Sequence, residues 1–204
     1  MAPDLPPSRL LLVEGADDEH VVRHLCSREP SIPDFAIDDK KGFLRLRDAI
    51  GPEIKVAGRI ALGILVDADD DLDARWEAVG HQLRQAAVDP PTRTSAAGTV
   101  VEGKPRVGIW LMPDNGSTGE LEDFIQRLLQ SGDPVWPRAQ RYIDDIPASH
   151  RKFTAGKILR AQIHAWLATR KEPRKMAAAI GAGDLNAKDP LATQFVDWLR
   201  RLFS

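Results

Sequence analysis

The sequence predicts an α/β protein in which a mostly parallel sheet is flanked by helices and is followed by a helical C-terminal layer. Continuous apolar runs at residues 60–66 and 107–112 are typical of strands that are buried on both faces. Helical patterns alternate with such runs up to residue 137, which favours strand–helix–strand units with right-handed crossovers. Beyond residue 137 no strand pattern remains, so helices are expected there.

Each element is predicted from its apolar spacing and its boundary residues. The expected elements before residue 137 are strands at 10–13, 35–37, 60–66 and 107–112, and helices at 42–50, at 72–88 and at 121–129. A further helix is expected to begin at Asp17 or Asp18 and to end before Pro30. Helices at 160–169 and 193–203 follow, and residues 134–147 are expected to form a junction. The predicted organisation is an α/β domain at 1–137 and a helical, partly basic extension at 138–204 packed on it.

Carboxylates follow two of the strongest predicted strands. Glu14 follows the first strand, and Asp67 and Asp69 follow the strand at 60–66. Ligand sites in parallel sheets open at the carboxyl ends of the strands, so these acids are expected to meet at one edge. On a regular strand Asp67 and Asp69 would point the same way, about 6–7 Å apart. Gathered carboxylates repel one another unless a proton or cation intervenes, and hard oxygen ligands suit Mg²⁺ or Mn²⁺.

An alternative interpretation needs no metal. Acids are common at helix N-termini, where they bind exposed backbone N–H groups. The acidic run from Asp67 to Asp71 would then only cap the helix that begins at residue 72.

An apolar strand ending in Glu-Gly (Glu14-Gly15), followed by one ending in Asp-x-Asp (Asp67-Ala68-Asp69), resembles the Toprim domain of topoisomerases, bacterial-type primases and overcoming-lysogenization-defect (OLD) nucleases. The stretches 108–115, 119–123 and 195–199 are similar to a small stand-alone Toprim family of unknown function. The likeness therefore spans nearly the whole chain. It implies a Rossmann-like fold and metal-dependent phosphodiester cleavage in nucleic acid.

The candidate metal ligands combine both lines of argument. Glu14, Asp67 and Asp69 are expected from their places after the strands, with Glu14 also a candidate general acid or base. Asp18 resembles the second residue of the Glu-x-x-x-Asp pair of OLD-type nucleases, and Asp17 competes for that role. Candidates for a second cation, or for groups that orient the ligands, are Asp114, Glu120, Glu122 and Asp123.

Basic residues are concentrated late in the chain. Residues 1–137 hold 15 Lys and Arg against 24 Asp and Glu, whereas residues 138–175 hold 10 against 3. A basic strip beside an acidic metal site suits a nucleic-acid backbone, although a solvated helix face explains the same pattern. Lys157 resembles the late lysine that stabilises the transferring phosphate in related nucleases. The predicted phosphate-binding residues are Gly15, Arg151, Lys152 and Arg160.

Other functional signals are weaker. Residues 98–105 nearly form a P-loop, but Pro105 replaces the Ser or Thr that binds Mg²⁺. His20 and His24 have a zinc-ligand spacing without a matching third ligand. Tyr142 permits a topoisomerase-like covalent step on chemical grounds, yet the chain lacks room for a DNA gate. An Asp-nucleophile phosphatase is disfavoured because its motif belongs on the first strand.

The expected setting is cytoplasmic, since no membrane span or signal-peptide pattern occurs and the single Cys26 excludes an intrachain disulfide. The expected partner is nucleic acid, DNA more than RNA. The expected cofactor is Mg²⁺ or Mn²⁺. The sequence is compatible with a nuclease that works alone and with one that works beside a separately encoded ATPase. The main rival function is a non-catalytic module that binds nucleotide or nucleic acid in a defence or repair assembly.

Overall fold

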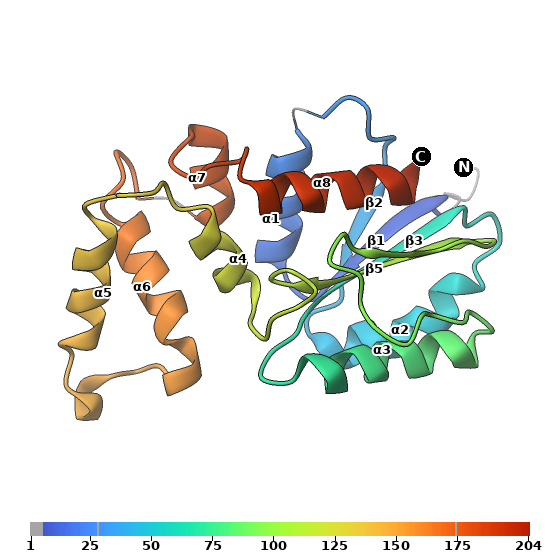
Figure 1. Cartoon of the computed structure of the whole chain (residues 1–204), viewed down its shortest axis with the longest axis horizontal. Helices are drawn as coiled ribbons and strands as arrows, with labels where there is room; N and C mark the ends of the chain where they lie inside the picture. The colour runs from blue at the N-terminus through green and yellow to red at the C-terminus, as the bar shows by residue number, and fades with distance from the viewer. Residues whose placement is uncertain (1–5, 28, 174) are drawn as a thin grey trace, which may run out of the picture.

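The predicted α/β architecture is confirmed by the computed structural model, which describes residues 6–27, 29–173 and 175–204. A five-stranded sheet has the order β2-β1-β3-β5-β4, with helices on both faces (Figure 1). Four strands are parallel and β4 runs antiparallel at one edge. The strands are β1 (Arg9–Val13), β2 (Ala36–Asp39), β3 (Ala61–Asp67), β4 (Thr99–Val101) and β5 (Arg106–Met112).

Helices occupy most of the remaining described chain. They are α1 (Ala16–Cys26), α2 (Phe43–Ile54), α3 (Leu72–Gln85), α4 (Leu121–Arg127), α5 (Trp136–Asp144), α6 (Ile158–Leu167), α7 (Met176–Ala182) and α8 (Pro190–Phe203). Two short 3₁₀ turns, η1 (Ala148–His150) and η2 (Ala155–Lys157), precede α6. No helix in the described part of the chain has the length and apolar character needed to cross a membrane.

The unbroken apolar runs of the strands are explained by two separate cores. Successive side chains of a strand point to opposite faces. Leu10 and Leu12 therefore join the core beneath α2 and α3, whereas Leu11 and Val13 join the core that includes residues of α1, α7 and α8. Figure 1 shows α2 and α3 on one side of the sheet and α8 on the other. Both faces of the central strands β1, β3 and β5 are therefore mostly buried and apolar.

The C-terminal helix α8 is part of the main core. Trp198 is fully buried, and its indole N–H donates to the carbonyl of Thr99 at 3.0 Å. Gly63 and Gly108 lie below Leu202 of α8, and a Cβ atom at Gly108 would come within 2.6 Å of that side chain. The predicted helical C-terminal layer is therefore confirmed for α8. In contrast, α5 and α6 pair with each other and extend away from the sheet (Figure 1).

Several element boundaries differ from the prediction. The expected junction at 134–147 contains α5, because Asp133 accepts hydrogen bonds from the N–H groups of Val135 and Trp136 and so starts a helix. The short elements β4 and α7 were not expected. The predicted N-cap at Asp17 or Asp18 is wrong, since α1 begins at Ala16 and Gly15 is the N-cap.

Candidate active site

Two of the predicted carboxylates meet at the carboxyl edge of the sheet. Strands β1 and β3 are parallel neighbours, with Leu12 opposite Ile64, so both end at this edge. Glu14 follows β1, and its Oε1 accepts a hydrogen bond from the N–H of Asp67 at 3.0 Å. Asp67 in turn accepts from the N–H of Leu121 at 3.0 Å, which ties the start of α4 to the same edge.

Asp18 lies beside this pair on the first turn of α1. Its Oδ2 accepts a hydrogen bond from the N–H of Gly15 at 3.0 Å, and the residue is only 8% exposed. Gly15 has an extended backbone (φ −151°), which any residue adopts. The Glu14-x-x-x-Asp18 spacing brings both acids to the start of α1.

Asp69 departs from its predicted geometry. Strand β3 ends at Asp67, and Asp69 has a left-handed backbone (φ +50°) whose N–H and carbonyl both pair with Gly119. Its carboxylate forms an ion pair with Arg75 and is about half exposed. The expectation that Asp67 and Asp69 point the same way on a regular strand is wrong, because the backbone leaves the strand between them.

Burial and mutual repulsion raise the pKa values of the central acids. The pKa of Asp18 is raised to about 7, first by burial and then by the charge of Glu14. The pKa of Asp67 is raised to about 9 by burial, with Asp18 and Glu14 adding to the shift. Burial also raises the pKa of Glu14, although the N–H of Asp67 and the charge of Arg75 oppose the shift. Without a cation, this edge holds its acids partly protonated at neutral pH.

The start of α4 brings two more acids, and the extension brings two cations to meet them. Glu120 pairs with Lys157, whose Nζ lies 2.6 Å from its Oε1. Glu122 is 5% exposed and lies 3.4 Å from Nε of Arg160. Arg160 also contacts Asp17 at 3.1 Å. Lys157 of η2 and Arg160 of α6 therefore cover one side of the sheet edge that holds Glu14, Asp18, Asp67, Glu120 and Glu122, which we call the acidic edge.

The charges of these groups affect one another. Burial raises the pKa of Glu122, and the charge of Arg160 opposes the shift. Partial burial lowers the pKa of Lys157, but hydrogen bonding to Glu120 and the nearby carboxylates outweigh it, so the pKa is raised overall. Lys157 thus stays cationic, and its charge interacts electrostatically with the carboxyl groups of Asp67 and Glu122.

Other predicted residues serve local structure. Asp114 accepts from the N–H groups of Gly116 and Ser117, and Asp123 accepts from the N–H of Glu120 at 2.8 Å. Arg151 donates to the carbonyls of Ile146 and Asp144 in the turn after α5. Lys152 is exposed in the same connection, and Arg174 of the basic strip lies outside the described residues.

Arg75 of α3 was not predicted and belongs to this edge. Its guanidinium pairs with Asp69, lies 3.7 Å from Oε1 of Glu14 and stacks on the ring of Phe43, with 3.6 Å to the centroid. The sequence shows only an arginine in an amphipathic helix, so no local pattern separates it from a solvated charge.

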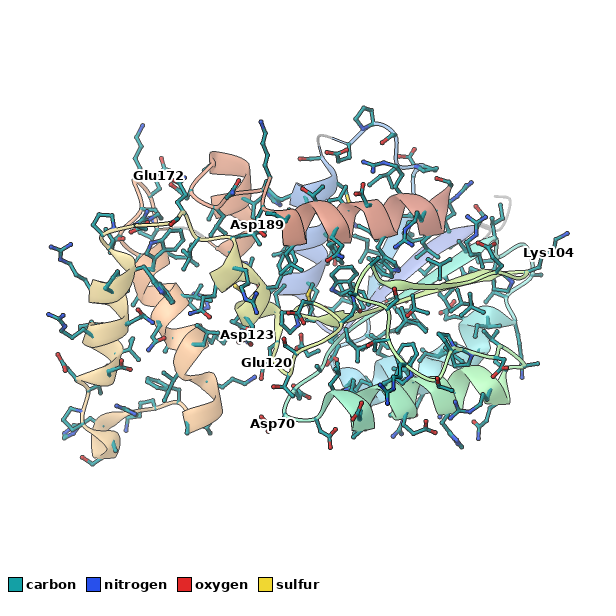
Figure 2. All side chains as sticks on the ribbon, in the orientation of Figure 1. Asp70, Lys104, Glu120, Asp123, Glu172 and Asp189 are labelled. Carbon is teal, nitrogen blue, oxygen red and sulfur yellow. The ribbon has the colours of Figure 1, made fainter. Side chains whose placement is uncertain are left out.

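A polar hollow of about 220 Å³ opens beside these groups. It is lined by residues of the 69–70 turn, of the α4 start and of the η2–α6 segment, among them Asp69, Glu122 and Arg160. Figure 2 shows Asp70, Glu120 and Asp123, all three of which line the hollow, at the end of the sheet that faces α6. The hollow gives a ligand access to Glu120 and Glu122, whereas Glu14, Asp18 and Asp67 are not among its lining residues.

The donor chemistry at this edge suits a hard divalent cation, since several buried carboxylates repel one another. In the arrangement described, however, no group of three or more His, Cys, Asp or Glu side chains converges as a cation would require. Asp69 is turned to Arg75 and Glu120 to Lys157. Cation binding would therefore require these side chains to exchange partners.

Comparisons with known proteins identify a family but no function. No curated protein and no solved structure matches the chain. A family model described as "Protein of unknown function (DUF3226)" matches residues 8–204, which covers the whole sheet, the acidic edge and the C-terminal helices. The chain therefore belongs to the DUF3226 family.

Proposed function

We propose that this protein is a metal-dependent phosphodiester hydrolase that acts on nucleic acid. The observation that carries the proposal is the group of buried, mutually repelling carboxylates of Glu14, Asp18 and Asp67 at the open edge of the sheet. Such an edge binds a proton or a cation in place of the missing countercharge. The resemblance of Glu14-Gly15 and Asp67-Ala68-Asp69 to the Toprim domain supports the same function.

The residues of the chain have distinct roles in this mechanism. Glu14, Asp18 and Asp67 would hold Mg²⁺ or Mn²⁺, and Asp69 would join them after it releases Arg75. A bound cation would lower the pKa of a water molecule and neutralise charge on the phosphate.

Lys157 and Arg160 act on the substrate from the other side. They would exchange their carboxylate partners, Glu120 and Glu122, for phosphate oxygens, and so stabilise the negative charge that develops there. If Glu14 does not bind the cation, it is the candidate proton acceptor, since its raised pKa makes its carboxylate a stronger base than that of an exposed glutamate.

A non-catalytic nucleotide- or nucleic-acid-binding module is the second candidate. It is favoured by the absence, among the described residues, of three side chains already converged for a cation. The two functions differ in an observable way: the module would bind nucleic acid, with or without Mn²⁺, and would not cleave it.

The test is cleavage of supercoiled plasmid, single-stranded DNA and RNA with Mg²⁺ or Mn²⁺, with calorimetric metal binding measured on the same samples. Glu14→Gln and Asp67→Asn should each lower cleavage at least a hundredfold, because each removes a ligand charge. Lys157→Met should lower cleavage about tenfold to a hundredfold while metal binding persists. Lys55→Met changes an exposed lysine at the C-terminal end of α2, outside the basic segment, and should cleave as the natural protein does.

The outcomes separate the candidates. Cleavage that Glu14→Gln and Asp67→Asn both abolish supports the hydrolase. Metal binding without cleavage of any substrate supports the non-catalytic module. Failure to bind either cation contradicts the carboxylate site itself.

A further inference from the structure

Arg75 has a donor that the fold leaves unused. The side chain is 10% exposed, and its Nη1 has no hydrogen-bond partner among the described residues. The distance of 3.7 Å to Glu14 is too long for a hydrogen bond. The ion pairs with Asp69 and Glu14 balance the guanidinium charge, but they leave this buried N–H donor without a hydrogen bond, which is unfavourable.

The guanidinium is held in a fixed plane. Nη2 pairs with Asp69, and the face of the group stacks on the ring of Phe43. Arginine in this setting presents its remaining donors in a rigid fork, which matches the oxygen atoms of a phosphate better than a flexible ammonium group does.

Phe43 is also the first residue of α2, whose N-terminus points to the same place. The N-cap residue Gly42 donates its N–H to the carbonyl of Glu14 at 2.7 Å, so the helix begins beside the acidic edge. The first turn of α2 holds no acidic residue. A twelve-residue helix with an uncapped N-terminus favours an anion through its exposed N–H groups and its dipole.

Phe43 and Arg75 line one hollow of about 330 Å³ together with the turn at Asp69, Asp70 and Asp71. This hollow is distinct from the one beside Glu120 and Arg160, and the two share Asp69 and Asp70. A chain of phosphates that enters at the α6 side and passes the carboxylates would reach Arg75 on the other side.

We propose that Arg75 and the N-terminus of α2 form a subsite for a backbone phosphate of the nucleic acid, next to the phosphate that is cleaved. This inference rests on the proposed function and adds where the strand lies. Arg75 would keep its stack on Phe43 and exchange Asp69 for phosphate oxygens, while Asp69 turns toward the cation.

The experiment measures binding of a single-stranded DNA hexamer in EDTA, so that neither metal nor cleavage is needed. Fluorescence anisotropy is compared for the natural protein, Arg75→Gln and Arg84→Gln. Arg84 lies on the same helix and pairs with the exposed Glu77, which makes it the matched control. Arg75→Gln should weaken binding about tenfold, and Arg84→Gln should leave it unchanged.

A second measurement on the natural protein keeps the test valid if Arg75→Gln does not fold. The backbone amide NMR signals of Leu44 and Arg45, in the first turn of α2, should shift on addition of the same hexamer. The inference is overturned if the hexamer binds and neither these signals nor the Arg75→Gln affinity changes, although the hydrolase proposal survives that result. It is also overturned if no hexamer binds. Arg75-dependent binding without cleavage by the metal-loaded protein would support the subsite and refute hydrolysis.

Discussion

At the residue scale, Asp67 shows how unfavourable the folded environment is for an ionised carboxylate. Its carboxyl group keeps one backbone partner, the N–H of Leu121, and otherwise faces the acids Asp18 and Glu14. Folding therefore raises its pKa from the usual 3.8 to about 9. A position this unfavourable for a carboxylate is typical of a functional site rather than of a stabilising contact.

The stability of the metal-free protein should depend on this group. A pKa raised by folding contributes stability that is complete below pH 3.8 and is lost as the pH rises toward 9. Asp67→Asn stays neutral and keeps the oxygen that accepts from Leu121. In EDTA at pH 8 it should therefore raise the free energy of unfolding by on the order of 2 kcal/mol, with little gain at pH 4.

Thermal unfolding at both pH values measures this effect. Asp73→Asn, which changes an exposed acid of α3, is the control and should show no comparable gain at pH 8. Equal unfolding temperatures for Asp67→Asn and the natural protein at pH 8 would contradict the buried, repelled carboxylate. Added Mn²⁺ should stabilise the natural protein and not Asp67→Asn.

Residue order along the chain correctly predicted that Glu14 and Asp67 meet at one edge, but it did not predict the direction of Asp69. The first two follow strands that are parallel neighbours, and strand polarity alone brings them to one edge. Asp69 lies beyond the strand, where the backbone pairing with Gly119 sets its direction. Arg75 was missed because it lies on α3, whereas its contacts Phe43 and Asp69 lie on α2 and in the turn after β3.

At the element scale, α8 determines how the antiparallel edge of the sheet is covered. Gly98 precedes β4 with a left-handed backbone (φ +79°), directly below Trp198. A Cβ atom at Gly98 would lie 2.5 Å from the indole ring. Two separate effects therefore require glycine here: backbone conformation and close packing.

Two substitutions separate these effects. Gly98→Ala should lower the free energy of unfolding by about 3 kcal/mol, since both the left-handed backbone and the clash contribute. Gly132→Ala has the same backbone conformation (φ +78°) with no atom within 4 Å of the new Cβ, and should cost about 1 kcal/mol. Urea unfolding measures both. An equal decrease in the free energy of unfolding for the two variants would show that Trp198 can move aside without destabilising the protein.

The elements missed from the sequence are short and depend on such contacts. Strand β4 has three residues and is defined by its pairing with β5. Helix α5 has Pro134 just before it and Pro137 in its first turn, yet Asp133 accepts from the N–H of Val135 at its start, and Ala139 and Ile143 are buried on its inner face. Local patterns of this length cannot be told from loops before the partner element is known.

At the scale of the whole molecule, negative and positive charges are concentrated in different parts of the chain. The net charge is −9 over residues 1–137 and +7 over residues 138–175. The fold returns part of the basic segment to the acidic edge, where Lys157 and Arg160 lie against Glu120 and Glu122. Arg75 also lies at this edge, 3.7 Å from Glu14. A phosphate backbone that crosses the edge would meet all three cations.

Binding of single-stranded DNA should therefore weaken with salt. If Lys157, Arg160 and Arg75 each neutralise one phosphate, affinity should fall by about twentyfold between 50 and 200 mM salt. Replacing Lys157 and Arg160 by Met should remove about two thirds of the slope of log affinity against log salt. Lys188→Met, at an exposed position before α8, should leave the slope unchanged. A slope near zero for the natural protein would contradict a phosphate-binding surface.

The sequence by itself determined the fold class and the meeting of Glu14 and Asp67 at one edge of the sheet. A strand that is buried on both faces is recognised from a run of consecutive apolar residues. The carboxyl ends of parallel strands lie at the same edge of the sheet, so the residues that follow such runs are expected there. Tertiary structure decided which groups complete the site. The pairing of Glu120 with Lys157, the turn that directs Asp69 away from Asp67, and the place of Arg75 beside Glu14 depend on packing between distant elements. Side-chain direction and burial arise only from that packing, and so do the raised pKa values of the acids.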